Sequence, residues 1–221
     1  GLLAPVTVSA KIILHNIWAS KPSIDWDDTL PDDLQKEWNG FRESLKYVQS
    51  ISFQRALKPK EATSPVLVIF SDGSKNAYGA AAYIRWKTPD GFKSNLVAAK
   101  SRIAPLKVIN IVRLELCGAV LNARLFAFIL KEMADIQFER IFHIIDSEIV
   151  KAQIDRDSYG FSSFVANRIG EIHDTTDREN FYWVEGDLNV ADMTTRECTA
   201  LDLGEQSEWP VSYTHLTLPT R

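Results

Sequence analysis

The stretch "IFSDGSKNAYGAAAYI", from Ile69 to Ile84, decides the fold. An acidic residue, Asp72, ends the apolar run "VLVIF", and a second run of small and apolar residues, "YGAAAYI", begins a few residues later. Two strands joined by a short polar turn would place Asp72 on a sheet, beside the turn. A carboxylate at that position is either a turn residue or part of a site.

The chain after Asp72 continues with further strand and helix patterns. Strands are predicted at 66–72, 78–86, 94–102, 140–146 and 180–186, and helices at 111–134, 163–174 and 189–196. Three consecutive strands followed by alternating helices and strands predict an α/β fold, with a mixed five-stranded sheet flanked by helices.

The first sixty residues have a different character. Apolar residues at helical spacing predict one helix over 7–19, and Pro31 begins a second pattern with an apolar face. A polar linker, Ala56–Pro65, follows. We therefore predict a helical extension (1–60), packed separately from the sheet, with its aromatic side chains buried against one another or against a missing neighbouring domain: Trp18, Trp38 and Phe41.

The second predicted unit is the sheet domain, residues 61–205, and the rest of the chain (206–221) is predicted to be a tail. The segment "VSYTHLTLPTR" (211–221) resembles translated sequencing-adapter sequence, and we expect it to be non-native.

Composition limits the function classes. No apolar run approaches the roughly 20 residues that span a bilayer, so no membrane partner is expected. The start "GLLAPVTV" has no Met or basic region, which excludes a signal peptide and indicates an internal cut from a longer chain. The two cysteines form no CxxC pair, which favours a reducing compartment and argues against a zinc site. A net charge of −4 argues against a free-standing nucleic-acid-binding protein, unless a tethered neighbour supplies affinity.

Four carboxylates occupy similar positions in the predicted elements. Asp72 and Asp146 end strands, Glu115 lies in the first turns of the long helix, and Asp192 opens the last helix. Taken singly, each has a structural explanation: a turn for Asp72, a solvent-facing helix position for Glu115, a helix start for Asp146, and a first turn capped by Asn189 for Asp192. Glu115 is harder to explain because its neighbours are apolar, and a buried carboxylate is costly unless it is paired or bound to a metal.

Taken together, the four acids indicate a metal site. If the first and fourth strands are adjacent, Asp72 and Asp146 lie side by side and the long helix carries Glu115 over them. Clustered carboxylates repel one another, and oxygen-only ligands select Mg²⁺ or Mn²⁺. We expect these three acids within one cation shell, with Asp192 at its rim, in a site suited to two-metal phosphodiester hydrolysis.

Several segments resemble the Pol polyproteins of BEL/Pao long-terminal-repeat retrotransposons. "FSDGSKNAYGAAAYIR", "RLELCGAVLNARL", "DSEIV" and "LNVADMTTRE" resemble their ribonuclease H region, and "DWDDTLPDDLQKEW" resembles the segment after their reverse transcriptase. The resemblance implies a ribonuclease H-like fold and Mg²⁺- or Mn²⁺-dependent cleavage of the RNA strand in RNA–DNA hybrids. It implies that Asp72, Glu115, Asp146 and Asp192 are the catalytic metal ligands. It further implies tethering to the reverse transcriptase domain in a cytoplasmic virus-like particle.

Candidate contacts to the hybrid are polar residues beside the acids and basic residues before the long helix: Ser74, Lys100, Arg102, Arg113, Ser147 and Asn189. For the basic residues, a solvated sheet edge is an equally good explanation. The loop "VEGDLNVAD" has Asp187 where many ribonucleases H carry a His near the last acid, which predicts slower turnover. His143 is mid-strand and is expected to be a packing or edge residue.

Two alternative functions remain open. The resembled region also carries the family label of a retrotransposon aspartic peptidase, although Asp72-Gly73-Ser74 has the wrong order for an Asp-Thr/Ser-Gly motif. The other alternative is a decayed ribonuclease H-like domain that only binds hybrid or a partner domain.

Overall fold

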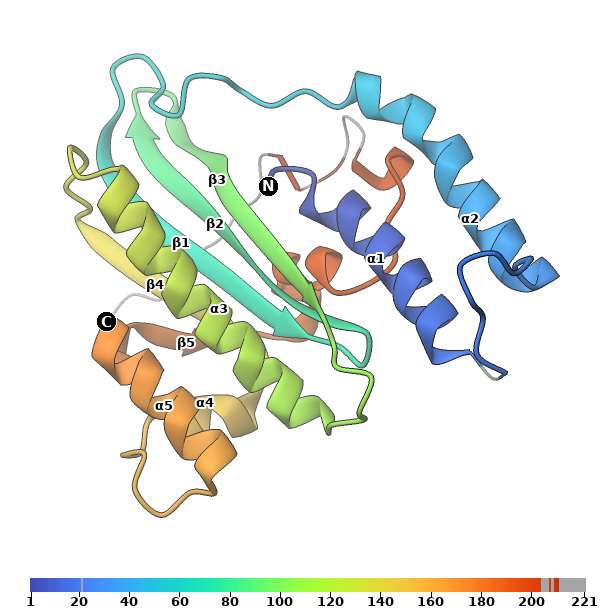
Figure 1. Cartoon of the computed structure of the whole chain (residues 1–221). Coiled ribbons are helices and arrows are strands. Elements are labelled where there is room, and N and C mark those ends of the chain that lie inside the picture. The colour runs from blue at the N-terminus through green and yellow to red at the C-terminus, as the bar shows by residue number, and fades with distance from the viewer. Residues whose placement is uncertain (21, 204–206, 208, 211–221) are drawn as a thin grey trace.

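The protein is described by a computed structural model, which places residues 1–20, 22–203, 207, 209 and 210 (Figure 1). Five strands form one mixed sheet in the order β3-β2-β1-β4-β5. They are β1 (Thr63–Gly73), β2 (Ala77–Thr88), β3 (Gly91–Ile103), β4 (Arg140–Ile145) and β5 (Phe181–Trp183). β1 pairs antiparallel with β2 and parallel with β4, which confirms the predicted mixed sheet and the adjacency of the first and fourth strands.

One face of the sheet is covered by α3 (Ile111–Glu132), which crosses it diagonally in Figure 1. Leu121, Leu125 and Ile129 of α3 pack against the side chains that β1 and β2 direct to this face, including Ile69 and Ile84. α5 (Ser163–Thr175) packs against the outer side of α3. Burying this face gives the sheet and the long helix a common core.

Two helices differ from prediction. α4 (Glu148–Ile154) was not predicted, because its seven residues span too few turns to show a period. It begins at Ser147, whose side chain accepts a hydrogen bond from the Val150 amide. The helix expected at 189–196 is instead a short 3-10 helix, η4 (Val190–Thr194), and a further 3-10 turn, η3 (Gly186–Leu188), precedes it.

The other face of the sheet is covered by α1 (Ala4–Ala19) and the C-terminal part of the chain. Ala4 and Val6 belong to the same buried cluster as Phe70 of β1, and the Ser9 hydroxyl donates to the Cys198 carbonyl at 2.7 Å. The prediction that the N-terminal helices pack separately from the sheet is therefore wrong for α1.

α2 (Asp32–Ser44) lies against α1 at the periphery of Figure 1. Trp38 contacts Phe41, with 5.7 Å between ring centroids, but Trp38 remains 38% exposed. Trp18 contacts Trp26 instead, at 5.4 Å, and is half exposed. The predicted mutual burial of these aromatic residues is thus only partly present.

The core also includes Trp209, which lies beyond the predicted domain end at residue 205. Trp209 is fully buried; its indole N–H donates to the Leu2 carbonyl at 2.7 Å, and its carbonyl accepts from the Tyr83 hydroxyl at 2.9 Å. The expected non-native segment 211–221 lies outside the described residues. Within the described part of the chain, no helix has the length and apolarity needed to cross a membrane.

Candidate active site

A cavity of about 720 Å³ opens where β1 and β4 end. β1, α3, the end of β4 and η4 each contribute one carboxylate to its wall: Asp72, Glu115, Asp146 and Asp192. The structure therefore brings all four acids singled out in the sequence to one cavity. Other polar lining residues are Ser74, Lys75, Asp187, Asn189 and Arg196.

Two glycines let the α3 backbone touch the end of β1. A Cβ atom at Gly73 would lie 2.3 Å from the Glu115 amide nitrogen, and one at Gly118 would lie 2.5 Å from the Asp72 carbonyl oxygen. Any side chain at either position would push α3 away from β1. The close approach places Glu115 directly beside the strand that carries Asp72. A Gly inside a helical pattern was the signal that sequence reasoning could have used.

A buried polar network fixes Ser71, the residue before Asp72. The Asn122 side-chain amide donates to the Ile69 carbonyl at 2.8 Å and to the Ser71 hydroxyl at 3.2 Å, and Asn189 donates to the Ser71 carbonyl at 3.0 Å. Ser71 is thus held by α3 through its side chain and by the segment before η4 through its backbone. Sequence analysis missed Asn122, because nothing in a helical pattern shows which strand a buried amide will reach.

His143 completes this network from β4. Its Nδ1 lies 2.6 Å from the Asn122 Oδ1 atom, which can only accept, so Nδ1 carries the proton. The imidazole stacks on Phe181, with 4.7 Å between ring centroids, and burial lowers the pKa of His143 to about 3. His143 is therefore a neutral packing residue, as predicted.

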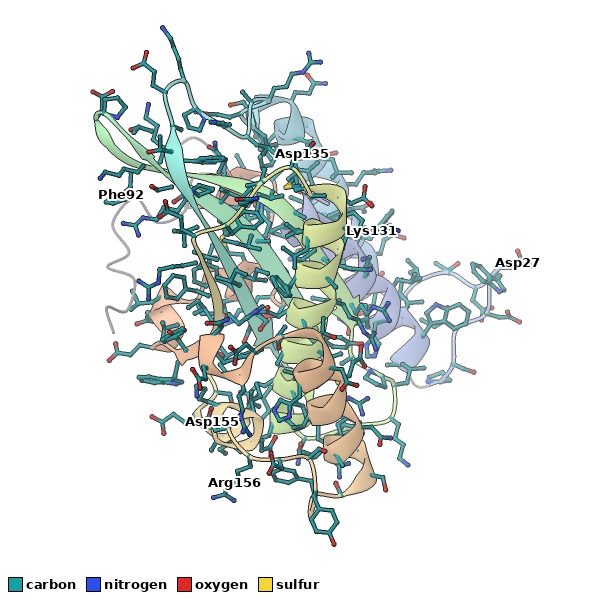
Figure 2. All side chains as sticks on the ribbon, turned by 90° about the vertical axis from the view of Figure 1, so that its left-hand side faces the viewer. Asp27, Phe92, Lys131, Asp135, Asp155 and Arg156 are labelled. Atoms are coloured by element: carbon teal, nitrogen blue, oxygen red, sulfur yellow. The ribbon has the colours of Figure 1, made fainter. Side chains whose placement is uncertain are left out.

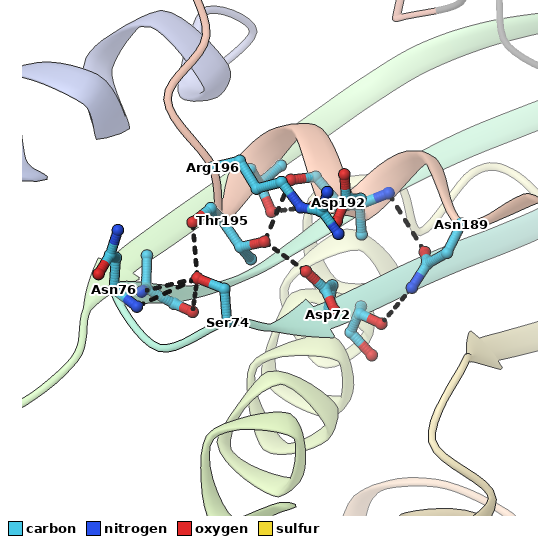
Figure 3. A network of polar contacts seen from close by, with 11 residues as sticks. Asp72, Ser74, Asn76, Asn189, Asp192, Thr195 and Arg196 are labelled. Atoms are coloured by element: carbon cyan, nitrogen blue, oxygen red, sulfur yellow. Dashed lines mark hydrogen bonds and ion pairs between the residues drawn. The ribbon is translucent and has the colours of Figure 1, made fainter. Parts of the chain in front are cut away.

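Asp72 is the most buried of the four acids, at 8% exposure. The Thr195 hydroxyl donates to Asp72 Oδ2, as Figure 3 shows. Burial, against the opposing Thr195 hydrogen bond and with a smaller contribution from the charges of Asp146 and Asp192, raises the pKa of Asp72 to about 6. The cavity therefore holds this carboxylate in an environment that disfavours its charge.

Glu115 and Asp192 are also perturbed. Burial raises the pKa of Glu115 and the charge of Asp146 adds to it, against a 2.6 Å hydrogen bond donated by the Ser147 hydroxyl. Burial raises the pKa of Asp192, and Arg196, whose Nε lies 2.6 Å from Asp192 Oδ1, opposes this. Thr195 and Arg196 are site residues that sequence analysis did not identify, because only the folded turn after η4 brings them to the acids.

The positions of the acids limit how they could hold a divalent cation. Among the residues that the structure describes, no group of three or more His, Cys, Asp or Glu side chains is placed to hold a metal ion. The prediction that Asp72, Glu115 and Asp146 share one cation shell is therefore wrong for this arrangement, in which Asp72, Glu115 and Asp192 each contact a side chain of the chain itself. In donor type and charge, however, a cavity walled by carboxylate oxygens suits Mg²⁺ or Mn²⁺.

The predicted hybrid contacts divide into two sets. Ser74 and Asn189 line the cavity, and Ser147 contacts Glu115 at its wall. The three basic residues predicted to contact the hybrid, Lys100, Arg102 and Arg113, do not line it. Arg102 lines a separate cavity beside α5, and Arg113 lies over the Phe164 ring, 4.9 Å from its centroid. Lys100 lines a groove between β3 and α3.

Comparison with solved structures finds ribonuclease H domains that share little sequence with this chain. The N-terminal RNase H domain of Rv2228c from Mycobacterium tuberculosis is 15% identical with a TM-score of 0.39, and the match covers 57% of this chain and 86% of that one. RNase H1 from Halobacterium salinarum NRC-1 is 16% identical with a TM-score of 0.37, covering 62% and 97%. LC11-RNase H1, isolated from compost and solved with an RNA/DNA hybrid, is 12% identical with a TM-score of 0.41, covering 63% and 99%.

No curated protein matches the chain. A family model described as Pao retrotransposon-like RNaseH-like domain matches residues 1–147, which is more than half of the chain. The matched segment contains α1, four of the five strands, and three of the four acids predicted as site residues: Asp72, Glu115 and Asp146. The sheet that the structure shows is the ribonuclease H-like fold expected from the sequence, and the chain belongs to the family of Pao retrotransposon-like RNaseH-like domains.

Proposed function

We propose that this domain is a divalent-metal-dependent endonuclease that cleaves the RNA strand of RNA–DNA hybrids during reverse transcription of a retrotransposon. The observation that carries the proposal is the cavity into which four separate elements direct one carboxylate each, in a chain of a ribonuclease H-like family. Four acids gathered at one end of a sheet do not help the fold, because their mutual repulsion opposes it.

Asp72, Glu115, Asp146 and Asp192 would hold Mg²⁺ or Mn²⁺ after their side chains turn from the arrangement described above, in which no three of them surround one ion. Such ions, when bound, activate a water molecule and stabilise the leaving oxygen of a phosphodiester. The chain supplies the positions of its ligands: Gly73 and Gly118 allow α3 to approach β1, and hydroxyl groups orient two of the carboxylates.

Binding of the hybrid needs more positive charge than Lys75 and Arg196 provide on the cavity wall. We propose that Lys100, Arg102 and Arg113 contact phosphates away from the cavity, and that Ser74, Ser147 and Asn189 contact the strand that enters it. A tethered reverse transcriptase domain, within the cytoplasmic particle of the element, would supply the rest of the affinity.

The test is a cleavage assay with a labelled RNA–DNA hybrid, in Mg²⁺, in Mn²⁺ and in chelator, using the wild-type protein and Asp146→Asn. Asp135→Asn is a matched control, because Asp135 lies in the turn after α3, remote from Glu115 at the other end of that helix (Figure 2). We expect the RNA strand to be cut only with metal, by the wild type and the control but not by Asp146→Asn.

Other outcomes would contradict this proposal. Hybrid binding without cleavage would favour the non-catalytic, decayed domain. Peptide hydrolysis that is inhibited by pepstatin would favour the aspartic peptidase. Equal cleavage by wild type and Asp146→Asn would exclude the carboxylate cavity as the active site.

A further inference from the structure

Arg196 is placed differently from every other cation of the described chain, because it combines a place on the cavity wall with an ion pair to one of the four acids. Its Nε lies 2.6 Å from Asp192 Oδ1, and Figure 3 shows the guanidinium group next to Asp192, above Asp72. The side chain of Arg196 is 71% exposed, and that of Asp192 is 32% exposed. Arg196 therefore reaches from solvent to the rim of the cavity.

The net charge of the cavity wall makes the Arg196–Asp192 ion pair relevant to binding of a nucleic acid. Five carboxylates line the cavity: Asp72, Glu115, Asp146, Asp187 and Asp192. Two cationic side chains line it in the described residues, Lys75 and Arg196, which leaves a formal charge of −3 (2 − 5). A nucleic-acid backbone would meet net repulsion here unless the carboxylates are compensated and a cation is free to face the phosphates.

The ion pair between Arg196 and Asp192 can be replaced by other contacts at little cost in stability. An exposed Arg–carboxylate pair contributes little to stability, so separating it costs the fold little. A guanidinium group forms equally well-matched hydrogen bonds to carboxylate and to phosphate oxygens. Asp192 is also one of the residues proposed to hold the divalent cation, so Arg196 and that cation would compete for the same carboxylate.

We propose that Arg196 is an exchangeable counterion that pairs with Asp192 in the metal-free protein and binds a phosphate of the nucleic acid once Asp192 is compensated by a divalent cation. This inference rests on the proposed function, and it adds a substrate-binding residue to it. It couples metal binding to substrate binding through a single side chain.

The proposal predicts effects of opposite sign on two affinities. Arg196→Gln removes the competitor for Asp192 and makes the cavity more negative, so the dissociation constant for Mg²⁺ should fall about three- to tenfold. The same variant should raise the dissociation constant for hybrid about three- to tenfold and reduce its logarithmic salt dependence by about one. A purely structural role for Arg196 would weaken both kinds of binding.

The experiment measures Mg²⁺ binding by calorimetry and hybrid binding by fluorescence anisotropy, in Ca²⁺ to prevent cleavage and over a range of salt concentrations. Arg196→Lys should keep part of the hybrid affinity. Arg178→Gln is the matched control, because it removes an exposed Arg–Asp pair of 3.1 Å that does not line the cavity, and both of its affinities should equal those of the wild type.

The experiment distinguishes failure of the Arg196 exchange from failure of the proposed function. If Arg196→Gln binds Mg²⁺ no more tightly than the wild type, or binds hybrid as well as the wild type, the exchange is refuted while the proposed function stands. If the wild type binds neither Mg²⁺ nor hybrid, the proposed function is refuted, and this inference with it.

Discussion

Replacing Asp72 with Asn should stabilise the metal-free protein at neutral pH. Burial raises the pKa of Asp72 from its ordinary value of 3.8 to about 6, so the folded protein disfavours the charged carboxylate. One pKa unit corresponds to about 1.4 kcal/mol, and the charge at Asp72 therefore costs the fold roughly 3 kcal/mol above pH 6. Asn has almost the same shape, no charge, and an oxygen that can still accept from the Thr195 hydroxyl.

The pH dependence has a defined sign. Between pH 3.8 and about 6 the folded protein binds the Asp72 proton more tightly than the unfolded chain does, so the wild type loses stability from this group as the pH rises through that window. The Asn variant does not titrate there. Its advantage should be near zero below pH 3.8 and reach its full value of roughly 3 kcal/mol above about pH 6.

The assay is urea unfolding followed by tryptophan fluorescence, in chelator, at pH values from 3.5 to 8. Glu171→Gln is a control of opposite sign. Hydrogen bonding by Arg124 lowers the pKa of Glu171, so removing this carboxylate should lower the free energy of unfolding by up to about 1 kcal/mol at neutral pH. The reasoning would be refuted if the Asp72→Asn protein were no more stable than wild type at pH 7.5. It would also be refuted if the gain in stability were as large at pH 3.5 as at pH 7.5. Saturating Mg²⁺ should reverse the order, because only the wild type keeps the full set of ligands.

Three further changes test other parts of the site. Asp187→His should raise turnover on hybrid at neutral pH and leave Mg²⁺ affinity nearly unchanged; unchanged steady-state cleavage would mean that this loop does not approach the scissile phosphate. Gly118→Ala should cost about 1–3 kcal/mol in urea unfolding and weaken Mg²⁺ binding, because its Cβ would collide with the Asp72 carbonyl, whereas Gly170→Ala, with open space, should not. Asn122→Leu should cost about 1–3 kcal/mol, because it leaves the Nδ1–H of His143 buried without its acceptor; a smaller loss in thermal unfolding would show that the network relaxes.

The sheet and the long helix could be predicted because their patterns are local. The run before Asp72 and the small apolar run after Tyr78 are each readable as a strand, and their short separation permits an antiparallel pair. Acids at the ends of two such strands were predictable site candidates for the same reason. These predictions used the position of each residue in its predicted strand or helix, and not the residues that it contacts.

Contacts between distant segments were not predictable in this way. The apolar face of α1 shows that the helix is buried, but not that Val6 joins the same buried cluster as Phe70 of the sheet. Trp209 looks like a tail residue until its indole reaches Leu2. Thr195 and Arg196 belong to a quoted segment, but nothing in it shows that they contact the acids, because a turn of the folded chain brings them to Asp72 and Asp192.

The hydrogen bond from Thr195 to Asp72 joins residues 123 positions apart, and it has a consequence for synthesis. β1, β2, β3 and β4 are complete once residue 145 has left the ribosome, yet Asn189, Asp192 and Thr195 are still to be made. The strands that carry and precede Asp72 and Asp146 are therefore synthesised before the segment that closes the cavity. A chain that ends before Asn189 would lack Asp192 and Thr195, and with them one wall of the cavity.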